Sequence, residues 1–231
     1  MSRFCVREDD LLMKTKKLVI TAMLLAIATV LSVIKLFELP FGGTVTPASM
    51  MPIVLIAYLY GTKWGIFSAF VYSIMQLVTG IGTVSAFFMP GDSQMALGAA
   101  VMVCVLDYFV AFTVLGFGGV FKGKFKSDII SIALGSVLAC LLRALAHIVS
   151  GAVFFGSWAE WFFSDTTGLS QISFFEGFCK WVMATFTGNG LAVFYSVIYN
   201  MAYMLPEMII TALAAPAVYK ILIRSKTTEN L

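Results

Sequence analysis

"RALAHIVSGAVFF", residues 143–155, lies within an apolar run that covers about residues 128–156. A run of that length can cross a bilayer, because a membrane-spanning helix needs about 20 apolar residues. The stretch nevertheless contains Arg143 and His147, the only histidine of the chain. An ionisable side chain in a membrane span is costly and usually faces the protein interior or a water-filled cavity. This stretch therefore predicts a membrane helix that carries part of a polar site.

The composition of the whole chain indicates an integral membrane protein. Of its 231 residues, 60% are hydrophobic and 12% are charged. That length supplies about five to seven spans and leaves no room for a catalytic domain outside the membrane. The net charge of +3 is too small to suggest nucleic-acid binding. The four cysteines show no CxxC spacing and indicate neither a zinc site nor a disulfide framework.

Six membrane-spanning helices are expected from the apolar runs between glycine, proline and charged residues. They cover about residues 16–37, 44–60, 62–80, 96–120, 128–156 and 190–223. With the amino terminus inside, twelve of the fifteen Lys and Arg residues fall on the cytoplasmic side, so the positive-inside rule places both termini there.

The expected architecture is therefore an all-α membrane protein with one domain. A polar cytoplasmic leader (residues 1–15) precedes a six-helix transmembrane domain (residues 16–224), and a cytoplasmic tail follows (residues 225–231). The domain includes a long extracellular loop at about residues 157–190.

Polar residues of three expected helices fall at similar depth. With a rise of about 1.5 Å per residue, Asp107 and Arg143 lie near the membrane midplane and His147 one turn further out. Tyr195 and Asn200 lie between the midplane and the outer boundary. This spacing leaves two interpretations open. The residues form a ligand site in the outer leaflet, or they only join helices, with Asp107 and Arg143 as an ion pair.

An intramembrane enzyme is the competing class, because Ser150 follows His147 in "HIVSG". A serine hydrolase also needs oxyanion donors at the same reacting atom, and nothing near this pair supplies them. The HExxH pattern of membrane metalloproteases is missing as well. Glu207, which follows Pro206, lies deeper in its helix than the proposed site and is expected to be structural.

Five stretches, in order along nearly the whole chain, carry a family resemblance. They are "GGTVTPASMMPI" (42–53), "GTKWG" (61–65), "LDYFVAF" (106–112), "LLRALAHIVSGAVFFGSWA" (141–159) and "YSVIYNMAYMLPEMIIT" (195–211). With these, the chain resembles the thiamine-specific substrate-binding subunits of energy-coupling factor transporters. The resemblance implies a six-helix bundle in a prokaryotic plasma membrane that is not an enzyme and captures thiamine in an outward-facing pocket.

The resemblance also implies partners and excludes a cofactor. Transport would be driven by a transmembrane coupling subunit and two cytoplasmic ATPases, and only these partners would use ATP. The chain agrees with this division, since it lacks the GxxxxGK[ST] phosphate loop of an ATP-hydrolysing subunit. Ala22 and Ala26, a pair of small residues four apart that permits close helix approach, would contact the coupling subunit.

Carried over by position, the resemblance assigns seven ligand-binding residues: Asp107, Tyr108, His147, Phe155, Trp158, Tyr195 and Asn200. A carboxylate suits the cationic thiazolium ring, the polar side chains suit the aminopyrimidine, and aromatic faces add stacking and cation–π attraction. Phe155 stands where some relatives have tryptophan, so Phe155 or the nearby Trp158 would stack on the ligand.

A second cargo keeps the same architecture. A related subunit could bind another vitamin or a thiamine precursor, such as a hydroxymethylpyrimidine or a thiazole compound. A neutral pyrimidine would not need the carboxylate of Asp107, so the sequence discriminates only partly between these ligands.

Overall fold

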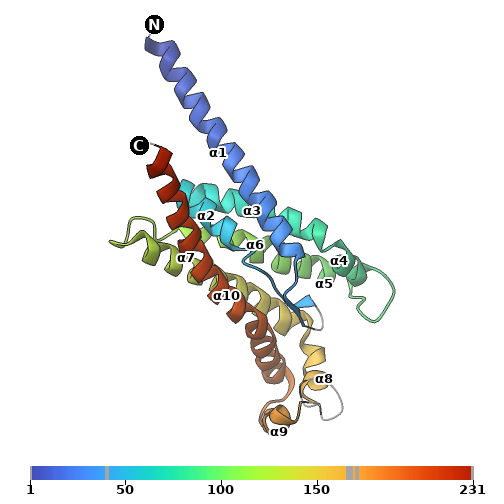
Figure 1. The fold of residues 1–231 in the computed structure, drawn as a ribbon. Helices are drawn as coiled ribbons and strands as arrows, with labels where there is room; N and C mark the ends of the chain where they lie inside the picture. The colour runs from blue at the N-terminus through green and yellow to red at the C-terminus, as the bar shows by residue number, and fades with distance from the viewer. Residues whose placement is uncertain (1, 40–41, 165–168, 170–171, 230–231) are drawn as a thin grey trace.

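Long helices form the protein, seen in Figure 1 as a computed structural model that describes residues 2–39, 42–164, 169 and 172–229. Three of them are single helices: α1 (Ser2–Val33), α7 (Asp128–Phe154) and α10 (Gly188–Glu229). A fourth is continuous but changes its winding. It consists of α5 (Leu97–Val103), the π-helical η2 (Cys104–Val110), α6 (Ala111–Thr113) and the 3₁₀-helical η3 (Val114–Gly119).

Two shorter helices complete the bundle. α2 (Met51–Tyr60) lies at its centre, and all its side chains from Pro52 to Tyr58 are buried. α3 (Thr62–Thr79) continues into α4 (Ile81–Phe88) after a bend of 69°. Among the described residues, four helices are long and apolar enough to span a membrane, or five if the bent pair counts as one span. The protein is thus a multi-pass membrane protein.

The count of six spans stays a prediction. α2 has ten residues, about 15 Å of helix, which is roughly half the thickness of a bilayer core. Both ends of the chain lie at the same end of the molecule in Figure 1, as an even number of crossings requires. The boundaries of the leader, the six-helix domain and the tail also stay predictions, although α1 itself begins as early as Ser2.

The segment between α1 and α2 differs from the expected helix at residues 44–60. It contains a short antiparallel hairpin, β1 (Phe37–Glu38) paired with β2 (Thr44–Val45). α2 starts only at Met51, with proline in its first turn, where a missing N–H costs nothing. We call residues 35–39 and 42–50 the hairpin segment; it forms one wall of the site described below.

The connection expected at residues 157–190 is partly helical. It contains η4 (Gly156–Trp158), α8 (Ala159–Phe163), η6 (Ser173–Phe175) and α9 (Glu176–Thr185). These elements lie at the end of the molecule opposite the two termini in Figure 1, as the predicted topology requires. Residues 165–168 and 170–171 of this connection lie outside the described residues.

Glycines let the central helices approach to backbone contact. A Cβ added to Gly119 of η3 would lie 2.2 Å from the carbonyl oxygen of Ala57 in α2. A Cβ on Gly135 of α7 would lie 2.0 Å from the carbonyl oxygen of Gly118. Small residues at helix contacts are the usual device of membrane bundles, where lipid gives no hydrophobic driving force. The position of η3 between α2 and α7 therefore depends on these glycines.

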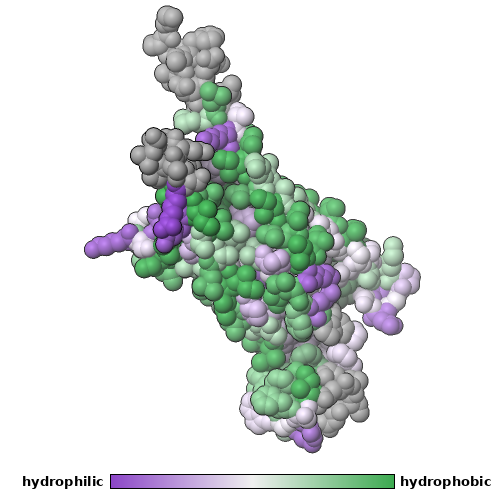
Figure 2. All heavy atoms as spheres, in the orientation of Figure 1, coloured by the Kyte–Doolittle hydropathy of each residue, from purple (hydrophilic) through white to green (hydrophobic). Residues whose placement is uncertain are grey.

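The outer surface of the bundle is apolar. Large exposed side chains include Ile27 of α1, Phe67 of α3, Val149 of α7 and Leu213 of α10. Figure 2 shows hydrophobic residues over most of the middle of the visible face. Such a surface would be unusual in a soluble monomer and suits contact with lipid.

Candidate ligand-binding site

A cavity of about 340 Å³ lies between the hairpin segment, the end of α1, α3, α4, η2, α7 and α10. Six of the seven predicted ligand-binding residues line it: Asp107, Tyr108, His147, Phe155, Tyr195 and Asn200. The seventh, Trp158, lines an adjoining cavity of about 410 Å³, whose lining also includes Phe155. Of the two aromatic residues predicted to stack on the ligand, Phe155 lines the first cavity and Trp158 does not.

Asp107 is the centre of the polar contacts in the cavity. Its Oδ1 lies 2.9 Å from Nδ1 of His147, and its Oδ2 accepts a hydrogen bond of 2.8 Å from the Oγ of Ser150. Asp107 belongs to η2, whose π-helical winding contains an additional residue per turn, a feature that often marks functional sites. Its side chain is 19% exposed, so the carboxylate is held by the protein and still reaches the cavity.

Arg143 contacts His147 and not Asp107. Its Nε donates to Nε2 of His147 at 3.3 Å, and its guanidinium carbon lies 4.3 Å from the ring centre of Phe112. Because Nε2 accepts this bond, the proton of a neutral His147 is on Nδ1 and points to Asp107. The ion pair between Asp107 and Arg143, which one of the two interpretations expected, does not join these two described residues; Asp107 instead contacts His147 and Ser150.

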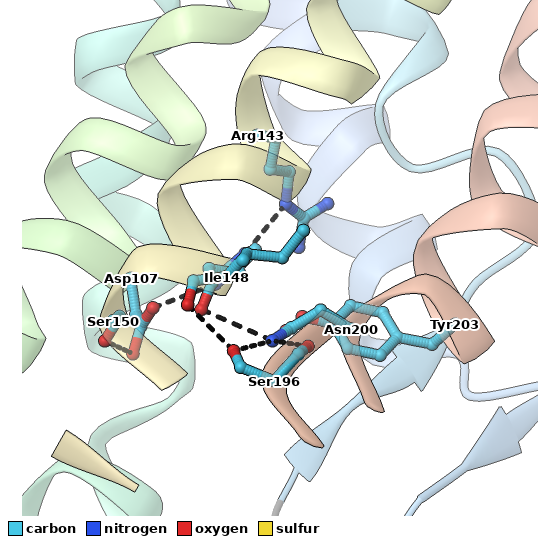
Figure 3. A network of polar contacts seen from close by, with 8 residues as sticks. Asp107, Arg143, Ile148, Ser150, Ser196, Asn200 and Tyr203 are labelled. Atoms are coloured by element: carbon cyan, nitrogen blue, oxygen red, sulfur yellow. Dashed lines mark hydrogen bonds and ion pairs between the residues drawn. The ribbon is translucent and has the colours of Figure 1, made fainter. Parts of the chain in front are cut away.

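Asn200 joins α10 to α7 at the cavity wall, as Figure 3 shows. Its Nδ2 donates to the carbonyl oxygens of Ser196 and His147, at 2.9 and 3.3 Å, and its Oδ1 accepts a 2.7 Å bond from the hydroxyl of Tyr203. The donors of this amide are therefore used within the protein. Its oxygen retains one acceptor position, which is what it could offer to a ligand.

Tyrosines of α10 form an aromatic side of the cavity. Tyr195, Tyr199 and Tyr203 follow each other at intervals of four residues, so they share one face of the helix. The rings of Tyr195 and Tyr199 are 5.8 Å apart, and those of Tyr199 and Tyr203 are 6.1 Å apart. The i, i+4 spacing in the sequence indicates that Tyr199 and Tyr203 share the helix face of Tyr195. Only Tyr195, however, is among the predicted ligand residues.

Glu207 lines the same cavity, although its depth in the helix suggested a place beyond the site. Its Oε1 accepts a 2.7 Å bond from the hydroxyl of Thr46 in the hairpin segment. The hairpin segment therefore descends to the level of Glu207 and extends the cavity inward. Ser150, for which the sequence suggested only a nucleophile, has its contact with the site through the hydrogen bond to Asp107.

Comparison with known proteins identifies the family. The family model described as "Thiamine transporter protein (Thia_YuaJ)" matches residues 18–164, more than half of the chain. The chain belongs to this family. The resemblance seen in the sequence is thereby confirmed.

Individual relatives agree with the family match. The thiamine transporter ThiT of Bacillus subtilis (strain 168) is 29% identical over 208 residues, which cover 85% of this chain and 86% of that protein. A solved structure of ThiT from Listeria monocytogenes superposes with a TM-score of 0.57 and 18% identity, over 93% of this chain and 97% of that one. The structural match supports the helical membrane fold.

As a member of a transporter family, the protein is not an enzyme. The geometry of the pair that suggested a hydrolase agrees, since the hydroxyl of Ser150 donates to Asp107 and not to His147. A serine nucleophile would instead be hydrogen-bonded to the histidine that removes its proton.

Ala22 and Ala26, the residues expected to contact a coupling subunit, both lie exposed on α1. Large exposed apolar side chains, among them Met23 and Ile27, flank them on the same helix. This face of α1 is thus not used for packing within the described bundle.

Proposed function

We propose that this protein is the thiamine-binding subunit of an energy-coupling factor importer and that its ligand occupies the cavity of about 340 Å³. The observation that carries the proposal is the carboxylate of Asp107, held by His147 and Ser150 in a cavity with aromatic walls. The other carboxyl and cationic side chains of the lining are Glu38, Glu207, Lys35 and Arg143. A carboxylate at Asp107 suits a ligand with one positive charge.

The residues suggest how thiamine is held. The thiazolium cation lies near Asp107, and the ring faces of Tyr108 and Phe155 contribute stacking and cation–π attraction. The aminopyrimidine, with its donor amino group, lies near the remaining acceptor position of Asn200 and the hydroxyl of Tyr195. His147 borders both parts and keeps the Asp107 carboxylate in place.

A thiamine precursor is the alternative ligand, and the charge of the site argues against a neutral one. A neutral hydroxymethylpyrimidine would leave the negative charge of Asp107 without compensation, since Arg143 does not pair with it. Purification from rich medium followed by mass spectrometry of the co-purifying small molecule would reveal the cargo. Recovery of riboflavin, biotin or a folate would contradict the proposed ligand.

The substitution His147→Ala tests the site. We expect it to weaken thiamine binding by roughly ten- to a hundredfold, because a desolvated hydrogen bond contributes about 1 to 3 kcal/mol. Quenching of tryptophan fluorescence measures the affinity, and a melting curve in detergent shows whether the variant is folded. Ser136→Ala is the matched control on α7, since its hydroxyl bonds only to the helix backbone at Ile132. Unchanged affinity in a His147→Ala protein that melts much lower would mean that the histidine only joins helices.

Uptake requires partners in this proposal: a transmembrane coupling subunit, docked on α1 at Ala22 and Ala26, and two cytoplasmic ATPases. The chain alone, reconstituted in liposomes, should bind thiamine without accumulating it. Accumulation without ATP and partners would instead indicate an ion-coupled carrier. Replacing both alanines by leucine should reduce uptake by the complete complex and leave thiamine binding by the isolated subunit unchanged.

The cellular setting follows from the same proposal. The protein would lie in the plasma membrane of a prokaryote, with the leader (1–15) and the tail (225–231) in the cytoplasm. The six-helix domain (16–224) would open its cavity to the outside, beside the loop at 157–190. The protein itself would need no cofactor.

A further inference from the structure

Glu207 places a further carboxyl group in the lining of the ligand cavity. Its side chain is 1% exposed, and it belongs to the cavity lining. Oε1 accepts two hydrogen bonds from Thr46, one from the backbone N–H at 2.5 Å and one from the hydroxyl at 2.7 Å. Oε2 is buried and has no hydrogen-bond partner among the described residues.

An unpaired buried carboxylate oxygen is unusual and costs free energy. The cost is larger when the unsatisfied acceptor is charged. Most buried polar side-chain atoms have a partner, so an orphan in a native protein points to a missing water, ion or ligand group. Arg143 attracts Glu207 electrostatically but makes no hydrogen bond to it within the described residues. Oε2 therefore carries an acceptor position that no described protein group fills, on a residue that belongs to the cavity lining.

The position of Glu207 fits a donor on the bound molecule. It follows Asn200 by seven positions on α10, which is about 10 Å along the helix. Both residues line one cavity, with Tyr203 between them. A ligand of two linked rings with a short side chain, held at Asn200 by one end, would extend towards Glu207 with the other.

We propose that Glu207 contacts the ligand: Oε1 fixes Thr46 and the hairpin segment, and Oε2 accepts a hydrogen bond from a donor group at the inner end of the bound molecule. The inference rests on the proposed function. Thiamine has two such donors, the hydroxyl of its hydroxyethyl chain and the amino group of its pyrimidine, at opposite ends of the molecule. Because the proposed orientation places the amino group at Asn200, the donor expected to meet Glu207 is the hydroxyl of the hydroxyethyl chain.

The test compares three ligands: thiamine, an analogue with ethyl in place of hydroxyethyl, and an analogue with hydrogen in place of the amino group. Glu207→Gln removes the charge and replaces one acceptor oxygen by a donor. We expect it to bind thiamine roughly ten- to a hundredfold more weakly than the parent. For the analogue that lacks the contacting donor, the difference between Glu207→Gln and the parent should shrink to less than about threefold.

Thr46→Val is the matched control. It removes the hydroxyl bond to Oε1 and leaves Oε2 in place, so any loss of affinity should be equal for the three ligands. If Glu207→Gln binds thiamine like the parent, or loses the same factor for all three ligands, the proposed contact is wrong. If Glu207→Gln does not fold, the affinities of the unsubstituted protein for the three ligands test the contact. Equal affinity for all three would exclude it.

The two proposals fail in different ways. If the unsubstituted protein does not bind thiamine, the proposed function is wrong and the contact falls with it. If it binds thiamine but shows no coupling between Glu207 and a ligand donor, only the role of Glu207 is wrong.

Discussion

Asp107→Asn is expected to weaken thiamine binding by roughly a hundredfold or more. Removing one partner of a buried, hydrogen-bonded charge pair typically costs about 2 to 5 kcal/mol, and each 1.4 kcal/mol is a factor of ten. The amide group of the asparagine would also point its N–H hydrogens at His147 or Ser150, which contact the carboxylate of Asp107 in the parent protein. Isothermal titration calorimetry with thiamine and with neutral hydroxymethylpyrimidine measures the effect. The cationic ligand should lose far more affinity than the neutral one.

The control for this substitution is Glu160→Gln. It makes the same change from carboxylate to amide on the exposed surface of α8, outside the lining of both described cavities. Its affinity for thiamine should equal that of the parent. An equal loss for the cationic and the neutral ligand in Asp107→Asn would show that the carboxylate shapes the site without compensating the ligand charge.

Gly135→Val is expected to destabilise the whole bundle. Even the first carbon of a side chain at this position would lie 2.0 Å from a backbone oxygen, that of Gly118, so α7 and η3 must separate. Overpacking costs about 1 to 3 kcal/mol where side chains can adjust, and here the obstacle is backbone. We expect a loss of about 3 kcal/mol or more, which is roughly a 10 °C fall in melting temperature for a domain of this size. Tryptophan-detected size-exclusion profiles after heating in detergent measure it.

Gly98→Val is the matched control, because a Cβ at this position of α5 meets nothing within 4 Å. Its melting temperature should stay within about 2 °C of the parent, as for a typical surface change. Gly135→Ala should fall between the parent and Gly135→Val. A Gly135→Val protein that melts like the parent would show that η3 can move away from α7 without loss of packing.

The sequence predicts best those features that depend only on the length of apolar runs and on depth along a helix. The expected helix at residues 62–80 corresponds to α3 (Thr62–Thr79), and the run at 128–156 to α7 (Asp128–Phe154). Counting residues along the helices also predicts similar depths in the membrane for Asp107, His147 and Asn200. The three residues line one cavity. Their contact with ligand stays a prediction.

Depth alone could not give the direction in which a side chain points. Asp107 and Arg143 are level, yet Arg143 is turned to His147 and Phe112. Trp158 follows α7 in a single 3₁₀ turn, which directs it to the adjoining cavity. Glu207 was placed beyond the site because its depth was measured along its own helix, while Thr46 reaches it from the hairpin segment. Such contacts depend on tertiary packing, which cannot be predicted from the spacing of residues along one helix.

The π-helical segment η2 has a consequence for comparing this protein with its relatives. Its seven residues, Cys104–Val110, include one more per turn than an α-helix, so a relative with a regular helix there would be one residue shorter. A correct alignment would then need a gap inside a membrane-spanning helix, where alignments are usually kept continuous. Without that gap, Asp107 would be matched to a neighbouring position, about 100° away around the helix axis. Equivalent carboxylates in two members of the family would then not be matched to each other.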